Sequence, residues 1–258
     1  MTELMRRRRA LMAQDGPEDL HLNDILTLDG IKNTRSGHNS SSTKWEDLSG
    51  NQHDFTRYHT GSALIWNANH LRFNAEGYST SATNKQRLTA TADLQGNGNL
   101  LTVEFVAKFT GHGTYTGSDG DYGVLFANAQ DNTPTAGRFL FRTYSNSAFT
   151  SVGYSGAYGT TGLVYMGGAK TTRYVAYVFD GSKVTEYRDG TKYDSTSNPK
   201  NVTYQSGTKN TGWTLGGSNN NSLYINAEIY RIGISAKVMT ATEIAERYQY
   251  FKQRFSMP

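Results

Sequence analysis

The sequence predicts an all-β fold, a sandwich of antiparallel sheets that is closed by one C-terminal helix. Residues 101–109 alternate apolar and polar side chains with the period of two that is typical of a half-buried strand. Turn residues separate further short segments of this kind, and the chain of 258 residues has 27 Gly but only 4 Pro. Since no helical pattern intervenes between these segments, a β-sandwich is favoured.

The expected strands are 101–109, 123–127, 138–144, 149–154, 163–166, 173–179, 184–188, 191–194 and 223–234. Between two of them, Asp189 and Gly190 predict a two-residue hairpin turn, because its central positions need positive φ values. Glu104 and Glu186 lie alone on their strands, and we interpret both as surface charges. No repeat with a period of 20–50 residues is visible, which argues against a propeller or a solenoid.

The C-terminal helix begins after Thr240. Thr240 and Glu243 form the pattern of a capping box, and Met239 can pack against Ile244 across the first turn. Aromatic and apolar residues then recur at helical spacing on one face, so we interpret them as packing residues. They are Ile244, Tyr248, Phe251 and Phe255.

The N-terminal segment differs from the rest of the chain. Residues 2–14 predict a short helix that Asp15, Gly16 and Pro17 end. We therefore divide the chain into a basic helical arm with linker, residues 1–24, and a sandwich domain, residues 25–258. The arm holds four of the 26 basic residues and leaves 22 to balance 22 acidic ones. The residues expected to anchor the arm to an assembly partner are Leu4, Met5, Arg6, Arg7, Arg8, Arg9, Leu11 and Met12. The alternative is a solvated terminal segment.

Composition excludes several function classes. Without Cys there is no disulfide, thiolate zinc site or cysteine nucleophile. No apolar run approaches the roughly 20 residues that span a bilayer. Only residues 10–13 are apolar after Arg9, too few for a secretory signal, so we expect a protein made and assembled inside a cell. The balanced charge of the body predicts no nucleic-acid partner.

Three segments together resemble the concanavalin A-like, laminin-G-like jelly-roll domains of bacterial and phage proteins. Residues 45–54, WEDLSGNQHD, are similar to the opening W-x-D-x-S-G-N element of such domains, in which we expect Asp47 to be structural and to bond turn amides. Residues 173–182 and 186–190 are similar to their strand, Asp-Gly turn and Y-x-D-G hairpin. Residues 215–217, 225–232 and 240–246 look like their closing strand followed by L-T-x-x-E-I. The resemblance covers about residues 25–255 and implies a jelly-roll sandwich.

The resemblance leaves function open, because these domains include lectins, glycosidases, lyases, adhesion modules and structural proteins. The glucanases among them carry an E-x-D-x-x-E motif, and no such motif occurs in this sequence. The Gly-x-Ser-x-Gly elbow of lipases is also missing, as is a His pair with metal-ligand spacing. We therefore predict that the chain is not an enzyme. An Arg-rich start without a signal peptide looks like phage particle proteins.

Calcium is a second question that the sequence raises. Relatives in the superfamily often bind this ion through loop Asp, Asn and carbonyl oxygens. Residues 118–121, Ser-Asp-Gly-Asp, offer two carboxylates, with Asp131 and Asn132 as further candidates. The alternative is an ordinary solvated acidic turn, so the prediction is no required cofactor, with calcium left open.

Sugar binding would use aromatic faces for stacking and short polar side chains for the hydroxyls. Three regions have that composition, and their candidate residues are Tyr115, Asp119, Asp121, Tyr122, Tyr144, Asn146, Tyr154, Tyr158, Trp213 and Asn219. The alternative is that Tyr is simply frequent in strands.

The sequence thus favours a non-enzymatic surface protein of a phage particle that binds carbohydrate and is anchored by its N-terminal arm. Its expected partners are other virion proteins, cell-surface or mucus glycans and further copies of itself, without nucleic acid or membrane. One alternative is a carbohydrate-active enzyme or depolymerase subunit with an unrecognised carboxylate pair. A second is a structural decoration protein that has no ligand.

Overall fold

The computed structural model describes residues 24–58, 63–74, 86–94, 100–112, 122–128, 139–144, 149–154, 160–165, 171–193, 200–201, 212–217 and 224–258. These residues form two antiparallel sheets and one helix. Residues 1–23 of the predicted N-terminal arm, which include all of its anchor residues, lie outside the described residues.

The first sheet has nine strands in the described part of the chain. Along the sheet the order is β14 (Thr191–Lys192), β13 (Lys183–Arg188), β12 (Arg173–Asp180), β7 (Leu100–His112), β17 (Ile225–Ser235), β5 (Leu71–Phe73) and β4 (Ile65–Trp66). Two strands lie beside this path: β1 (Asp24–Asp29) pairs with β17, and β15 (Lys200–Asn201) pairs with β13.

The second sheet has eight described strands. Their order is β11 (Thr160–Tyr165), β10 (Phe149–Tyr154), β9 (Phe139–Tyr144), β8 (Tyr122–Ala127), β16 (Gly212–Leu215), β6 (Leu88–Thr91), β3 (Phe55–Arg57) and β2 (Lys44–Trp45). Strands distant in sequence therefore become neighbours, as β16 does between β6 and β8.

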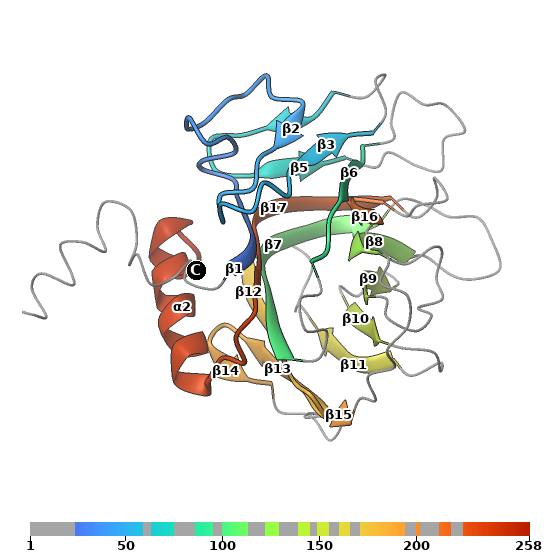
Figure 1. Cartoon of the computed structure of the whole chain (residues 1–258), viewed down its shortest axis with the longest axis vertical. Helices are drawn as coiled ribbons and strands as arrows, with labels where there is room; N and C mark the ends of the chain where they lie inside the picture. The colour runs from blue at the N-terminus through green and yellow to red at the C-terminus, as the bar shows by residue number, and fades with distance from the viewer. Residues whose placement is uncertain are drawn as a thin grey trace, which may run out of the picture.

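The described elements form three layers, with the helix α2 (Ala241–Arg254) on one face of the first sheet and the second sheet on the other (Figure 1). The prediction of an antiparallel β-sandwich with a short C-terminal helix is confirmed. The first sheet is covered on both faces, which explains why β12 and β17 carry apolar residues on both.

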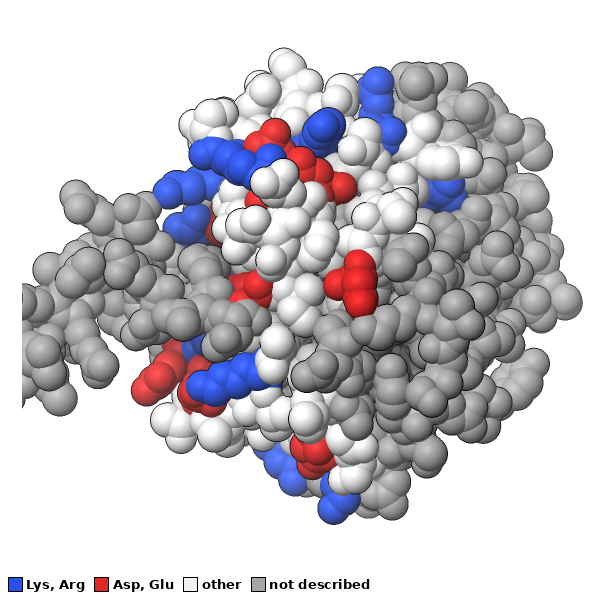
Figure 2. Space-filling model, in the orientation of Figure 1, with Lys and Arg blue, Asp and Glu red and all other residues white. Residues whose placement is uncertain are grey.

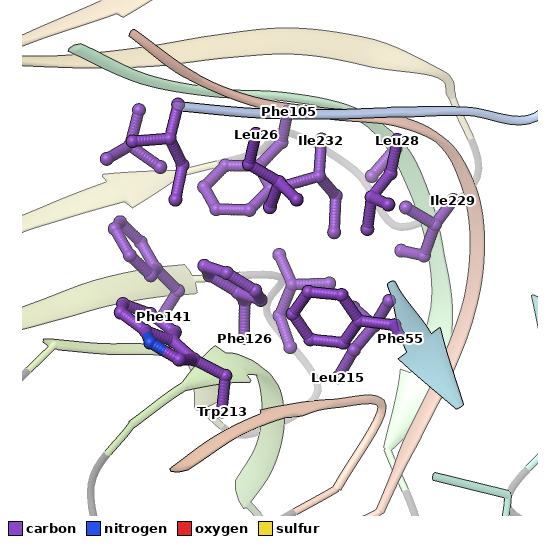
Figure 3. Packing of buried hydrophobic residues seen from close by; sticks show 14 of the residues in the cluster. Leu26, Leu28, Phe55, Phe105, Phe126, Phe141, Trp213, Leu215, Ile229 and Ile232 are labelled. Carbon is purple, nitrogen blue, oxygen red and sulfur yellow. The ribbon is translucent and has the colours of Figure 1, made fainter. Parts of the chain in front are cut away.

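The main core lies between the sheets. In Figure 3, Leu26, Phe105 and Ile232 of the first sheet point toward Phe126 and Trp213 of the second. The rings of Phe126 and Trp213 stack with centroids 4.8 Å apart. Such burial supplies most of the favourable free energy of folding.

A second core lies between the first sheet and α2. The predicted capping box is present: the Thr240 side chain accepts from the N–H of Glu243, and the Glu243 carboxylate accepts from the N–H of Thr240. Ile244, Phe251 and Phe255 are buried in this core, as their spacing predicted, and Tyr248 packs against it. The helix is therefore an integral layer of the domain.

Glu104 is buried, so the prediction of a surface charge at this position is wrong. We expected a surface charge on a half-buried strand, but α2 covers that face of β7 and leaves the Glu104 residue only 2% exposed. Arg247 of α2 donates from Nε to Glu104 Oε2 (2.8 Å), and Arg231 of β17 donates from Nε to Oε1 (3.1 Å). Tyr174 Oη also donates to Oε2 (3.0 Å). A buried carboxylate is thus compensated by two arginines.

The ionisation of Glu104 follows from these contacts. Burial alone would raise the pKa of Glu104, but the charges and hydrogen bonds of Arg247 and Arg231 outweigh it and hold this pKa at about 2. Burial and the Glu104 charge raise the pKa of Tyr174, so its hydroxyl stays protonated. Asp24 of β1 lies 3.4 Å from the Arg231 guanidinium of β17, so β1 is linked to α2 through Arg231, Glu104 and Arg247.

Glu186 is the second correction, because it is also buried rather than on the surface. It lies on the same side of β13 as the core residue Val184, and its cross-strand partner on β12 is the buried Tyr177. The predicted solvent exposure of Glu186 is therefore wrong, because Glu186 lies on the face toward the second sheet, whereas Glu104 lies on the face toward α2. Both faces of the first sheet are covered.

Asp47 has the structural role that its motif predicted. Its Oδ1 accepts from the backbone N–H groups of Thr27 (2.9 Å) and Ser49 (2.9 Å). Its Oδ2 accepts from Ser49 Oγ (2.8 Å) and from the N–H of His53 (3.1 Å). Trp45 of the same motif is buried and donates from Nε1 to the Asp29 carbonyl (3.0 Å). The motif thus ties the 45–54 segment to β1.

The Asp-Gly hairpin also matches its prediction. Asp189 and Gly190 have φ values of 47° and 77°, and Arg188 of β13 pairs with Thr191 of β14. Across the described ranges, the chain contains no helix long and apolar enough to cross a membrane.

Candidate functional site

The structure gives side-chain positions for few of the predicted sugar-binding residues. Tyr122, Tyr144 and Tyr154 lie on β8, β9 and β10, where their strand positions are known. Those outside the described residues are Tyr115, Asp119, Asp121, Asn146, Tyr158 and Asn219. The candidate calcium turn at 118–121 and residues 131–132 also lie outside them.

Trp213 is a correction. Its side chain is in the core of the sandwich, only 2% exposed, and its Nε1 donates to the Ala92 carbonyl (3.1 Å). One face of its ring is stacked on Phe126. Position 213 faces inward, because side chains alternate along β16 and Gly212 and Thr214 face the other way. Trp213 therefore cannot stack on a sugar without unfolding β16.

Strand register brings two predicted tyrosines together and separates the third. Tyr122 is the direct cross-strand partner of Tyr144, which in turn pairs with Phe149, and Phe149 pairs with Tyr165. These pairings place the four positions at one level across β8 to β11. Tyr154 pairs with Phe139, which lies at the other end of β9 from Tyr144.

An exposed aromatic residue lies at the same sheet, at the end of β3. Tyr58 is the most exposed of the large apolar and aromatic side chains that the structure describes, at 51%. Its backbone N–H donates to the Arg87 carbonyl (2.9 Å), which extends the β3–β6 ladder by one residue. The Arg87 guanidinium lies over the Tyr58 ring, 3.8 Å from its centroid. This cation–π contact holds the ring, and the residue as a whole stays about half exposed.

Tyr224 completes this cluster from the segment that leads into β17. Burial raises the pKa of Tyr224, against the charge of nearby Arg87, which lowers it. A side chain at Gly217 would collide with the Tyr224 ring, since a Cβ there would lie 2.8 Å from Cδ1. Gly217 therefore lets the Tyr224 ring lie directly against the backbone after β16. We call Tyr58, Arg87 and Tyr224 the tyrosine–arginine cluster.

The tyrosine–arginine cluster lies on the outer face of the second sheet. Leu88 of β6 points into the core, so the adjacent Arg87 belongs to the outer face. Val124 of β8 and Thr214 of β16 are buried. Among the large apolar and aromatic residues that the structure describes on this sheet, exposure thus concentrates at Tyr58.

The sequence analysis missed all three residues of the cluster. Tyr58, Arg87 and Tyr224 come from distant parts of the chain, and only the pairing of β3 with β6 brings the first two together. The one signal available was the alternation of Phe55 and Arg57 with Thr56 and Tyr58, which puts Tyr58 on the face opposite to the core.

A carboxylate–tyrosine pair lies on the first sheet. Tyr230 donates from Oη to Glu228 Oε2 (3.0 Å), and Lys108 Nζ lies 3.1 Å from the same atom. The pKa of Tyr230 is raised, by burial first and then by Glu228, so the phenol is a poor nucleophile. Burial of Glu228 is outweighed by Lys108 and Tyr230, which lower its pKa. This arrangement suits a structural ion pair.

Charge is mixed on the surface that the structure describes. Figure 2 shows basic and acidic side chains close to one another over the described part of this face. Arg35, for example, pairs with both Glu46 and Asp54. No group of three or more His, Asp or Glu within the described ranges could hold a metal ion.

No protein-family model and no curated protein matches the chain. Solved structures do match. A sialidase of Trypanosoma rangeli in complex with sialic acid has a TM-score of 0.60 and 14% identity, over 90% of this chain and 33% of its own. Botulinum neurotoxin type C, whose cell entry depends on two ganglioside molecules, has a TM-score of 0.60 and 12% identity, over 90% and 52%.

A third match is the binding domain of botulinum neurotoxin DC in complex with rat synaptotagmin II, with a TM-score of 0.58 and 12% identity, over 89% of this chain and 52% of that one. These likenesses establish the β-sandwich fold. The chain spans only about a third to a half of the length of these proteins, so their activities and ligands belong to the larger molecules.

Proposed function

We propose that the chain is a non-catalytic carbohydrate-binding β-sandwich whose ligand stacks on Tyr58. The observation that carries this proposal is a half-exposed tyrosine ring held from one side by a buried guanidinium. An aromatic ring that is already fixed loses little side-chain entropy when a sugar stacks on it. Its hydroxyl and that of Tyr224 add polar groups for orienting sugar hydroxyls.

The matched structures support the proposal without deciding it. Sialic acid is bound by the sialidase, and gangliosides are used by the type C neurotoxin. The sandwich fold is compatible with glycan recognition in larger proteins of both kinds. For this chain we propose binding without hydrolysis, because its described Glu228–Tyr230 pair is engaged by Lys108 and its phenol is hard to deprotonate.

The first test is a glycan array combined with an assay for release of reducing ends. We expect binding to one class of oligosaccharide and no release from any. Hydrolysis that is abolished by changing a single Glu or Asp would contradict the proposal and favour the alternative of a carbohydrate-active enzyme. Absence of binding across the array would favour a structural protein without a ligand.

We also propose that residues 1–20 of the N-terminal arm anchor the sandwich in a larger assembly such as a phage particle. Four consecutive arginines support this, because their planar groups pair well with carboxylates of a partner surface. The first described strand begins at Asp24, so a deletion of residues 1–20 leaves the sandwich strands complete.

Deleting residues 1–20 is expected to change the melting temperature by less than about 2 °C. Changes that remove no buried contact have effects of this small size. The same deletion should abolish incorporation into the assembly. Calorimetry and co-sedimentation measure the two effects. A truncated chain that is incorporated as efficiently as the full chain would rule out the anchoring role.

A further inference from the structure

The tyrosine–arginine cluster contains a charge that simple stacking on a neutral sugar does not use. Arg87 is only 2% exposed, and its guanidinium lies beneath the ring on which the proposed ligand stacks. This inference rests on the proposed function and concerns the class of its ligand. We propose that the site prefers a negatively charged sugar, one that bears a carboxylate or a sulfate, and that Arg87 is the positioning residue for that preference.

The guanidinium is charged under all ordinary conditions. Burial lowers the pKa of Arg87, and the phenols of Tyr224 and Tyr58 oppose that change. A guanidinium is so basic that it still carries its proton at neutral pH when burial lowers its pKa. The cluster therefore holds a permanent positive charge behind an exposed aromatic surface.

This charge is close enough to act on a ligand. The guanidinium carbon lies 3.8 Å from the ring centroid, and a stacked ligand lies about 3.5–4 Å from the other face. The Arg87 guanidinium and an anionic group on the ligand would then be about 7–8 Å apart. At this distance their attraction is about half of that between two charges 4 Å apart. Because the cation is buried, solvent and salt screen this attraction less than they screen a surface pair.

Two described neighbours of the cluster, Arg57 and Gln86, carry no negative charge that would oppose the attraction of Arg87 for an anion. Arg57 adjoins Tyr58 on the strand, and the Gln86 side chain is a neutral amide that bonds to the Asn74 N–H (2.7 Å) and the Ala63 carbonyl (2.7 Å). In the sequence, the stretches 59–62, 75–85 and 218–223, which adjoin the described segments of the cluster along the chain, contain one Glu and one Lys, so their formal charges cancel.

The test compares ligands rather than relying on variants alone. Binding of 3′-sialyllactose, its carboxyl methyl ester, 3′-sulfolactose and lactose is measured by calorimetry with the full chain at low and high salt. We expect each anion to bind about five- to tenfold more tightly than lactose, and the ester to bind as lactose does. Added salt should reduce the advantage. A preference for only one of the two anions would identify which acid the site takes.

Arg87→Met removes the charge but keeps an apolar stem beneath the ring. We expect this variant to bind lactose nearly as the wild type does and to lose the preference for the anions. If Arg87→Met does not fold, the comparison of acid and ester on the wild type decides alone. Equal affinity for acid, ester and lactose would overturn the inference and leave the proposed function standing. Failure of all four ligands, together with an empty glycan array, would overturn the proposed function itself.

Discussion

Replacing Glu104 with Gln is expected to lower the free energy of unfolding by about 3–5 kcal/mol, the cost of leaving buried charges uncompensated. The change keeps the size of the side chain but leaves Arg231 and Arg247 buried without the carboxylate that both contact. For a domain of this size the melting temperature should fall by roughly 10 °C. Urea unfolding followed by tryptophan fluorescence measures the loss.

The pH dependence of the free energy of unfolding tests the stabilising role of Glu104 independently. Its pKa is about 2 in the folded protein, below the ordinary value of 4.5, so the ionised carboxylate stabilises the fold. This contribution is complete above about pH 4.5 and is lost as the pH falls toward 2. The wild type should therefore lose stability in this window on the order of 3 kcal/mol more than Glu104→Gln does.

Glu246→Gln is the matched control, because Glu246 lies on the exposed face of α2. It should change the free energy of unfolding by no more than about 0.5 kcal/mol. If Glu104→Gln also stayed within 1 kcal/mol of the wild type, the buried pairs would not be what holds α2 on the first sheet.

Asp47→Ala is expected to have the second largest effect, a loss of about 3 kcal/mol or more. The carboxylate accepts four hydrogen bonds from Thr27, Ser49 and His53, and hydrogen bonds to a charged group contribute about 1.5–3 kcal/mol each. Alanine would leave buried N–H groups of the 45–54 segment without an acceptor. Thermal unfolding followed by circular dichroism measures the effect.

Asp180→Ala serves as the control for Asp47. Asp180 also accepts from backbone groups, at Ser182 and Lys183, but it is exposed, so water replaces the lost acceptor. We expect a loss of about 1 kcal/mol or less. Equal losses at the two positions would mean that burial does not distinguish them.

Local sequence patterns predicted the fold well where one segment contains all the groups involved. The capping box at Thr240, the positive φ values at Asp189 and Gly190 and the bonding of Asp47 each involve residues close in the chain or a motif with a defined turn. Glu104 and Glu186 could not be placed in this way. Period-two alternation indicates two faces, and it does not tell whether a distant helix or sheet covers the second one.

The candidate site shows the same limit. Trp213 was chosen for its ring and for the asparagines that follow it, but β16 turns the ring into the core against Phe126. Tyr58 has no distinguishing sequence context, and it becomes a candidate only because β3 and β6 place Arg87 beneath its ring. Composition identifies residues that suit sugars, whereas strand pairing decides which of them are exposed.

The most direct test of the account is the affinity of Tyr58 variants for the oligosaccharide that the wild type binds best. Calorimetry should show Tyr58→Ala binding about two- to tenfold more weakly, which corresponds to the roughly 0.5–1.5 kcal/mol of an aromatic contact. Tyr58→Phe, which keeps the ring, should lose less than Tyr58→Ala does. Ile65→Ala, at an exposed position on the first sheet, should bind as the wild type does. Wild-type affinity in a folded Tyr58→Ala would contradict the central claim and place the site elsewhere on the sandwich.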